Sequence, residues 1–208
     1  MSMENNNTLE YIKSKSGILT ALLNGIYLHS PTNPILEAQR FIHSKSDLLI
    51  KKTNFLVLGL GLGHHVNELH SQLVKLKKSH FKIYVIEPNL ALVERYKHSY
   101  NELTIISEKS IKDIYSSKEF IQFLKLTPGI IIHQGSYSAQ KDFFQEFLKY
   151  RNSKSLDNIL SEIKFDPIIN ILNKFNHNDE IHSIMEKIKG QISWNTEEKI
   201  ILAYNSLK

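Results

Sequence analysis

A glycine-rich loop between a buried apolar run and an amphipathic helix constrains the fold of this 208-residue chain most strongly. The segment from Asn54 to Leu58 is almost wholly apolar and ends in the loop Gly59-Leu60-Gly61-Leu62-Gly63. Such a run predicts a strand that is buried on both faces. From Leu62 to Leu76, leucine and valine recur at steps of four and three residues, which predicts an amphipathic helix that begins at the loop. A strand, a glycine turn and a helix in this order predict the first half of a parallel βαβ unit.

The same alternation continues along the chain. Three further strands are predicted, at residues 81–86, 103–106 and 130–133. Helices are predicted between and after them, at residues 89–98, at 111–125, and around Phe143, Phe144 and Phe147. Strands that alternate with helices favour right-handed crossovers and a sheet covered on both faces. We therefore expect a Rossmann-like, doubly wound α/β domain with a mainly parallel sheet over residues 50–152.

The two ends of the chain are expected to form helical flanks. In residues 1–49, the apolar positions from Thr8 suggest a short helix, a break at Gly17, and then more helix or strand. Asn33-Pro34 is typical of a helix start, so a helix is expected from Ile35 to about Ser46. Residues 153–208 are expected to form a helical appendage, with helices at 156–175, 181–188 and 196–207.

Composition excludes several classes of function. The chain has no cysteine, which excludes disulfides, cysteine zinc sites and thiol nucleophiles. No run of about 18 apolar residues occurs, so no membrane span is expected, and the polar N-terminus favours a cytoplasmic protein. The net charge is +5, but only Arg40, Arg95 and Arg151 are arginines. Because arginine is the better ligand for phosphates and bases, the excess lysine predicts a solvated surface and no nucleic-acid partner.

The glycine loop also predicts a binding site. Glycines allow backbone amides to approach a ligand, and the helix that follows presents unpaired amides. Glu87 stands twenty-four residues after Gly63, at the end of the next predicted strand. A carboxylate there can accept hydrogen bonds from ribose hydroxyls. Because ligands of open α/β sheets bind at the carboxyl ends of strands, Ser107 and Glu108 are further candidates.

The spacing of the glycines bears on the kind of ligand. In the dinucleotide pattern G-x-G-x-x-G, the last glycine would fall on His64. The observed G-x-G-x-G spacing resembles that of the class I S-adenosylmethionine-dependent methyltransferases and the spermidine synthases. Val57 stands where those methyltransferases usually carry an acid. An S-adenosylmethionine-type or nucleotide ligand is therefore possible. A glycine turn that serves only strand–helix packing is the alternative.

Other polar side chains are candidates for the rim of the pocket. His133, Gln134 and Tyr137 are candidates because they follow the last predicted strand. His133 is also a weak candidate for a general base. His29 and Ser30 precede the helix expected from Ile35 and could cover the glycine loop. His64 directly follows the last glycine of that loop. No pair among the histidines that follow the glycine loop has the i, i+4 spacing of a helical metal site, so no metal site is expected.

Several motifs in their order along the chain resemble a known family. These are Tyr27-Leu28-His29-Ser30, the segment Glu37-Ala38-x-Arg40-Phe41, the loop from Leu58 to His65, and Val85-Ile86-Glu87-Pro88. Together they resemble the N-terminal domain of the motility accessory factor (Maf) glycosyltransferases, over about residues 25–150. Position 64 is histidine here, where the family usually has an aromatic residue.

The resemblance implies a role in flagellin or surface glycosylation. The family transfers nonulosonic acids to serine or threonine of flagellin, and the transfer is assigned to a central domain for which 208 residues leave no room. We therefore expect a stand-alone accessory or nucleotide-binding domain whose partner is a separate glycosyltransferase chain or flagellin. Whether the chain is itself an enzyme, and its oligomeric state, stay open. The alternatives are an S-adenosylmethionine-dependent methyltransferase or aminopropyltransferase-like enzyme, and a degenerate Rossmann module that binds protein.

Overall fold

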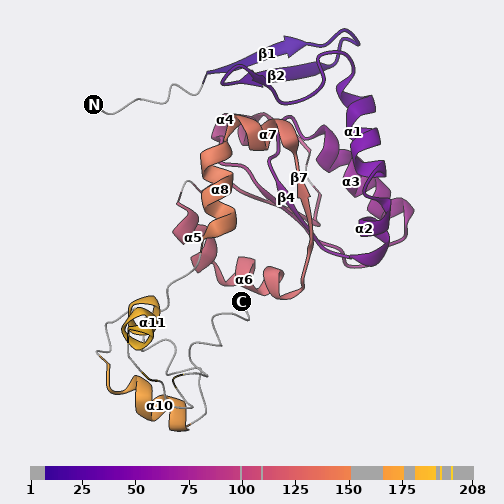
Figure 1. Cartoon of the computed structure of the whole chain (residues 1–208). Coiled ribbons are helices and arrows are strands. Elements are labelled where there is room, and N and C mark those ends of the chain that lie inside the picture. The colour runs from indigo at the N-terminus through magenta and orange to yellow at the C-terminus, as the bar shows by residue number, and fades with distance from the viewer. Residues whose placement is uncertain are drawn as a thin grey trace, which may run out of the picture. The chain divides into compact units, whose positions relative to one another are not determined.

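The computed structural model describes residues 8–98, 100–108, 110–150, 166–175, 181–190, 193 and 198. It divides into two compact units, Met1–Tyr150 and Arg151–Lys208. The first unit holds a parallel sheet with helices on both faces and a small antiparallel sheet beside one end of it (Figure 1). This is the α/β, Rossmann-like fold that the alternation of strands and helices predicts.

The parallel sheet has four strands: β4 (Phe55–Leu58), β5 (Ile83–Ile86), β6 (Leu103–Ile106) and β7 (Gly129–Ile132). Their order across the sheet is β6-β5-β4-β7, and every neighbouring pair is parallel. Taken in chain order, this is the 3-2-1-4 arrangement of one Rossmann half plus the strand beyond the switch point. The carboxyl ends of β4 and β7 therefore lie side by side, with Leu58 paired to Ile132.

The expectation of a helix at the N-terminus is wrong. β1 (Leu9–Lys13), β2 (Leu19–Leu23) and β3 (Ile26–Tyr27) form an antiparallel sheet in the order β1-β2-β3. The turn between β1 and β2 contains Gly17 at a φ of 79°, and the tight turn before β3 contains Gly25 at 76°. Two five-residue strands separated by a glycine turn make a hairpin, because each run is too short for a stable helix. The hairpin lies next to α4 (Leu90–Arg95) and α7 (Gln134–Ala139) in Figure 1.

The remaining helices of this unit mostly follow the predicted positions. Asn33 caps α1 (Pro34–His43) by accepting a hydrogen bond from the Leu36 amide. The single helix expected over residues 111–125 is two, because Ser117 is extended and caps the second helix. The helices not yet named are α2 (Ser46–Lys51), α3 (His64–Lys75), α5 (Ile111–Ser116), α6 (Lys118–Lys125) and α8 (Lys141–Lys149).

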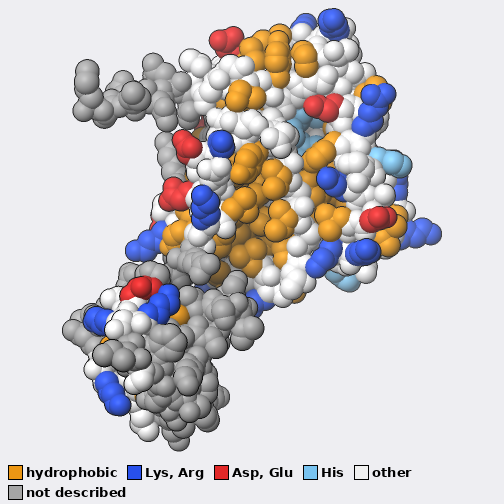
Figure 2. Space-filling view, viewed as in Figure 1, with side chains coloured by type: hydrophobic (Ala, Val, Ile, Leu, Met, Phe, Trp, Pro, Cys, Tyr) orange, Lys and Arg blue, Asp and Glu red, His pale blue; other side chains and the backbone are white. Residues whose placement is uncertain are grey.

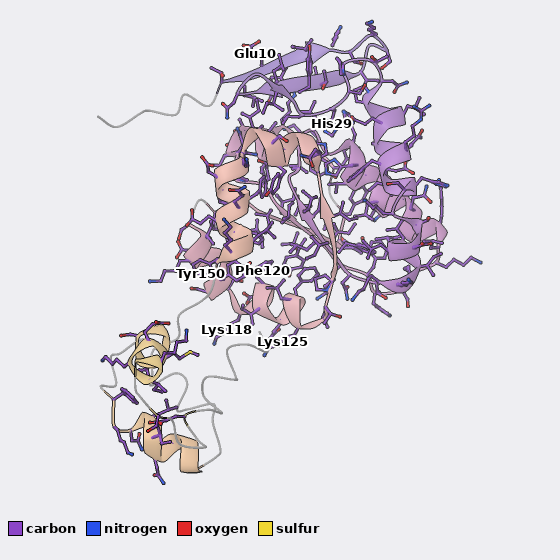
Figure 3. All side chains as sticks on the ribbon, viewed as in Figure 1. Glu10, His29, Lys118, Phe120, Lys125 and Tyr150 are labelled. Atoms are coloured by element: carbon purple, nitrogen blue, oxygen red, sulfur yellow. The ribbon has the colours of Figure 1, made fainter. Side chains whose placement is uncertain are left out.

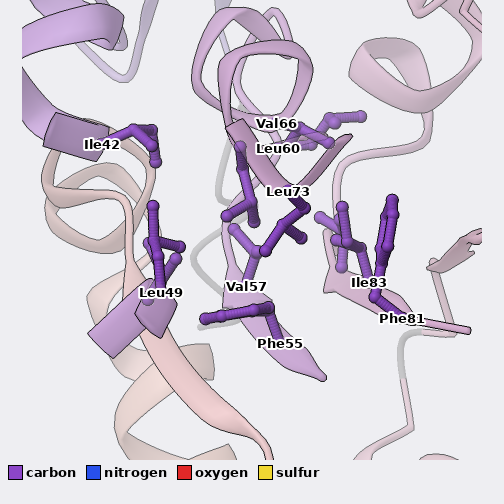
Figure 4. Close-up of a cluster of buried hydrophobic side chains, with 12 residues drawn as sticks. Ile42, Leu49, Phe55, Val57, Leu60, Val66, Leu73, Phe81 and Ile83 are labelled. Carbon is purple, nitrogen blue, oxygen red and sulfur yellow. The ribbon is translucent and has the colours of Figure 1, made fainter. Parts of the chain in front are cut away.

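Each face of the parallel sheet has its own apolar core. On one face, α1, α2 and α3 place residues such as Ile42, Leu49 and Leu73 against Phe55 and Val57 of β4 (Figure 4). On the other face, α5, α6 and α8 supply mainly aromatic side chains; this cluster includes Leu56, Leu58, Ile86, Phe120, Phe123, Phe144 and Phe147. The central strand β4 is therefore buried on both sides, as its apolar sequence predicts.

The second unit is described in part. It contains α10 (Asp166–Leu172) and α11 (Ile181–Lys189), which fall within two of the three helices expected there. The third expected helix, at residues 196–207, lies outside the described residues apart from position 198. No helix among the described residues is long and apolar enough to cross a bilayer.

Strand β7 forms one edge of the parallel sheet and is only half covered. Its residues alternate between buried and exposed, with Ile130 52% and Ile132 37% exposed. By register these two lie beside Leu56 and Leu58, on the face that α8 covers elsewhere. Figure 2 shows hydrophobic side chains gathered on this face of the first unit, between α8 and β7. Among the described residues no strand pairs with the outer edge of β7, so the sheet there presents an apolar surface beside an open edge.

A stability measurement tests which face of α3 packs in the core. Leu69 lies in the middle of α3, is fully buried, and packs against the parallel sheet. We expect Leu69→Ala to lower the free energy of unfolding by about 2–5 kcal/mol through the lost transfer energy and the cavity left behind. Val74→Ala on the same helix is the control, since Val74 is 54% exposed and surface changes stay within about 0.5 kcal/mol. Urea denaturation measures both, and equal losses would contradict the assigned helix face.

Candidate functional site

The loop after β4 has the backbone that its glycines predict. Gly59, Gly61 and Gly63 all have positive φ, at 93°, 51° and 79°. An L side chain adopts this region at a cost, so the glycines are required by the turn itself. Gly63 is the N-cap of α3, and no side chain caps the helix there. The loop thus sits at the carboxyl end of the sheet with the N-terminus of a 12-residue helix beside it.

The space above the loop glycines is taken by side chains of the same chain. A Cβ atom on Gly59 would collide with Ser136, and one on Gly63 would collide with the ring of Tyr96. At Gly61 the nearest atom would be His29 Nε2, at 2.7 Å. The glycines therefore allow close approach, but the groups that approach belong to this protein.

Glu87 connects the loop to two other elements. It is fully buried, and its Oε2 accepts the Leu60 amide at 2.8 Å. Its Oε1 accepts the Asn89 amide at 3.0 Å and Gln140 Nε2 at 2.9 Å. Burial raises the pKa of Glu87 above its ordinary value, against the opposing effect of these donors. The carboxylate that the sequence assigns to a ribose is thus fully engaged inside the fold.

The structure brings seven of the predicted residues together at the loop. His29, His64 and His133 join the three glycines and Glu87 at the ends of β4 and β7. His29 Nε2 accepts the Leu62 amide at 3.0 Å. His64 Nε2 lies 3.0 Å from the Leu19 carbonyl oxygen of the hairpin.

Of the other predicted residues, Gln134 lines a pocket with His29 and His133, while Ser107 and Glu108 lie apart from this group. Ser107 and Glu108 follow β6, which is separated from β4 by β5, and Glu108 is exposed. Gln134 is exposed on α7, while Tyr137 stacks against Phe144 with ring centroids 5.8 Å apart. Ser30 donates its amide to Glu37 Oε2 at 2.7 Å.

A cluster of buried histidines lies between the hairpin and the parallel sheet; we call His29, His65 and His133 the histidine cluster. Figure 3 shows His29 just below the hairpin. The rings of His65 and His133 stack with centroids 4.0 Å apart and planes 9° apart. The His29 ring is 4.5 Å from that of His133 and 5.6 Å from that of His65. The three residues come from the segment after β3, from α3 and from the end of β7.

Burial sets the protonation of the cluster. It lowers the pKa of His29 from its ordinary value, although a hydrogen bond that His29 donates to the Glu37 carboxylate opposes the shift. Burial, followed by the neighbouring histidines, lowers the pKa of both His65 and His133 well below the ordinary value. The imidazoles are therefore neutral at pH 7, with lone pairs available.

Two pockets flank the loop. One has a volume of about 130 Å³ and is lined by the histidine cluster together with Glu37, Phe41 and Gln134. The other, of about 350 Å³, lies at the start of α3 and is lined by residues that include His64, Arg95 and Lys97. Glu87 lines neither of these two pockets.

Sequence reasoning missed four residues that shape this site: His65, Tyr96, Ser136 and Gln140. His65 is 1% exposed and lines the pocket of about 130 Å³. The one signal in the sequence for a buried His65 is its position in the first turn of the helix, two residues after Gly63. No local pattern marks Ser136 or Gln140, because their roles depend on α7 lying across the ends of β4 and β7.

Comparison with known proteins gives a limited result. No protein-family model and no curated protein matches the sequence. Among solved structures, MNMC2 from Aquifex aeolicus is similar with a TM-score of 0.44 and 16% identity, over 68% of this chain and 65% of that one. Spermidine synthase from Thermotoga maritima is similar with a TM-score of 0.43 and 12% identity, over 68% and 62%. This chain thus spans less than two thirds of either.

The neutral histidines predict a pH dependence of stability. Their folded pKa values lie below the unfolded value of 6.5, so the unfolded chain binds more protons as the pH falls below 6.5. Stability is therefore present above this pH and is lost as the pH falls toward the folded pKa values. We expect His65→Phe to make the fall between pH 7 and pH 5.5 shallower, by up to about 1.4 kcal/mol per pH unit.

Urea denaturation at several pH values measures this slope. Glu87 acts in the opposite direction, since its raised pKa removes stability as the pH rises above 4.5. Because Glu87 is present in both proteins, the difference between wild type and His65→Phe isolates the histidine. Identical slopes would show that His65 is charged or solvated in the folded protein.

Proposed function

We propose that this chain is a Rossmann-like accessory module that acts by binding another protein, and that its glycine loop holds no nucleoside. The observation that carries the proposal is the state of Glu87. Both of its oxygens accept protein N–H groups, and the side chain is fully buried. A ribose could reach this carboxylate only after the Leu60, Asn89 and Gln140 hydrogen bonds had been broken.

The packing above the loop supports the same proposal. Ser136, His29 and Tyr96 occupy the positions from which a ligand would contact the backbone of Gly59, Gly61 and Gly63. A ligand would therefore have to displace α7, the hairpin segment and the end of α4 together. The cost of breaking several buried hydrogen bonds works against such a displacement.

The apolar face of β7 supports the choice of a protein partner. Ile130 and Ile132 are exposed side by side on an edge strand whose outer edge is open within the parallel sheet. An open edge with apolar side chains is a ready site for a further strand or helix from another chain. An exposed apolar surface of this kind is typical of a protein-binding site.

The sequence resemblance to the Maf N-terminal domain names a class of partner. In this proposal the partner is a transferase chain that moves nonulosonic acids, and the module holds or positions it. The spacing of the glycines favours one other function, an S-adenosylmethionine-dependent methyltransferase or aminopropyltransferase-like enzyme. The two proposals differ in whether an adenosyl ligand binds.

A ligand panel tests the closed loop. The purified chain is heated with S-adenosylmethionine, S-adenosylhomocysteine, decarboxylated S-adenosylmethionine, NAD, CMP and UDP. A ligand at 100 times its Kd would stabilise the fold by roughly 2.7 kcal/mol and raise the Tm by about 5–10 °C. We expect no such shift with any of them. A shift with an adenosyl ligand that disappears in Glu87→Ala would overturn the proposal and establish the transferase alternative.

A binding experiment tests the docking face. The chain is mixed with a purified nonulosonic acid transferase chain, and complex formation is measured by light scattering and by titration. We expect a complex that Ile130→Asp weakens by roughly tenfold or more, because a charge would then have to be buried in an apolar interface. Leu90→Asp is the matched control, since Leu90 is 46% exposed on α4, away from β7. The absence of a complex, or equal weakening by both variants, would contradict this proposal.

A further inference from the structure

The histidine cluster carries a second inference, independent of the nucleoside question. One ring nitrogen from each of His29, His65 and His133 lies within 4.8 Å of the other two, and all three residues are buried. They come from three separate elements, so no local spacing in the sequence reveals the group. A buried set of three neutral imidazoles is the donor set that zinc and neighbouring first-row metals prefer.

His65 has an unsatisfied lone pair that points to a ligand. Its Nε2 lies 3.0 Å from the Gly59 carbonyl oxygen. A carbonyl oxygen can only accept, so Nε2 carries the proton and Nδ1 carries the lone pair. Nδ1 is buried and has no hydrogen-bond partner. Buried polar atoms are nearly always satisfied, so a lone pair without a donor indicates a missing electropositive partner.

Each histidine is also held by an outer group, as metal-bound histidines are. A ligating imidazole usually donates its other N–H to a carbonyl, hydroxyl or carboxylate, which fixes the ring and its tautomer. For His65 that group is the Gly59 carbonyl. For His133 it is Ser136 Oγ, 2.8 Å from Nδ1, and for His29 it is the Glu37 carboxylate, 3.7 Å from Nδ1. Nε2 of His29 and of His133 would then face the metal, which requires His133 to carry its proton on Nδ1, donate it to Ser136 Oγ and no longer accept the Ser136 amide.

Two contacts must change when a metal binds. His29 Nε2 now accepts the Leu62 amide at 3.0 Å, and the Ser136 amide approaches His133 Nδ1 at 3.4 Å. The nitrogens of a tetrahedral zinc site lie about 3.3 Å apart, given Zn–N bonds of 2.0–2.1 Å. The rings therefore have to move closer together, and the Leu62 amide has to leave His29.

We propose that His29, His65 and His133 bind one divalent first-row transition metal of the zinc class, with a fourth position open to the pocket beside Glu37. That pocket of about 130 Å³ has room for a bound water or a small ligand. The half-exposed Glu37 carboxylate stands at its edge, next to His29. The site resembles in its donors the three-histidine zinc centres that keep one position for water.

Metal titration tests the site on the full chain. The protein is treated with a chelator, exchanged into clean buffer, and titrated with Zn²⁺ and, separately, with Co²⁺. We expect one equivalent to bind, and Co²⁺ to give the intense visible absorption of a four-coordinate site. His65→Ala and His133→Ala should each abolish that absorption and weaken Zn²⁺ binding at least 100-fold. His70→Ala is the matched control, because His70 lies on the same helix but stacks on Tyr100, outside the cluster.

Two further measurements keep the test decisive if a buried variant fails to fold. Glu37→Gln changes a half-exposed residue and should weaken Zn²⁺ binding by about 10–100-fold through its effect on His29. In NMR spectra, Zn²⁺ should shift the Leu62 amide, since its hydrogen bond to His29 is replaced. Overturning results are no Co²⁺ absorption, or metal binding that His70→Ala weakens as much as His65→Ala, which would indicate adventitious surface histidines.

Discussion

The buried carboxylate of Glu87 is the interaction on which the carboxyl end of the sheet depends. It joins the glycine loop through Leu60, the end of β5 through Asn89, and the junction of α7 and α8 through Gln140. Removing a carboxylate from water is costly, and three N–H donors offset part of that cost. A strand-end acid that serves a ligand in other α/β proteins serves the fold here. The loop is held on one side by Glu87 and on the other by Ser136, His29 and Tyr96, and in our proposal it serves the fold and no ligand.

The hairpin and α7 complete this closed arrangement. Thr20 Oγ1 donates to the His29 carbonyl oxygen at 2.8 Å, which fixes the segment that carries His29 to the hairpin. A side chain at Gly135 would collide with the backbone at Leu28, so α7 packs directly beneath the same segment. His29 and His133 are therefore brought together by backbone packing. The histidine cluster forms where these segments pack over the loop. It places three imidazole donors at the carboxyl end of the sheet.

The sequence predicts the sheet better than it predicts the site. Apolar runs such as Phe55–Leu58 mark strands buried on both faces, and the periodicity after Leu62 marks α3, because each signal is local. The hairpin was missed because its strands are short and their pairing depends on the turn at Gly17. The positions of Gly59, Gly61, Gly63 and Glu87 were found, but their partners were not. Ser136 reaches the loop, and Gln140 reaches Glu87, only once β7 pairs with β4, so no spacing along the chain reveals them.

Hydrogen exchange of the Leu60 amide is the most direct test of the account. This amide lies in a glycine loop, where exchange is ordinarily fast, but it donates to the buried Glu87 carboxylate at 2.8 Å. We expect it to exchange as slowly as amides of the central strand β4, and to lose that protection in Glu87→Ala while the Val57 amide keeps its own. Fast exchange of Leu60 in the wild-type protein would contradict the closed loop. It would mean that the loop opens to solvent and that Glu87 is available to a ligand.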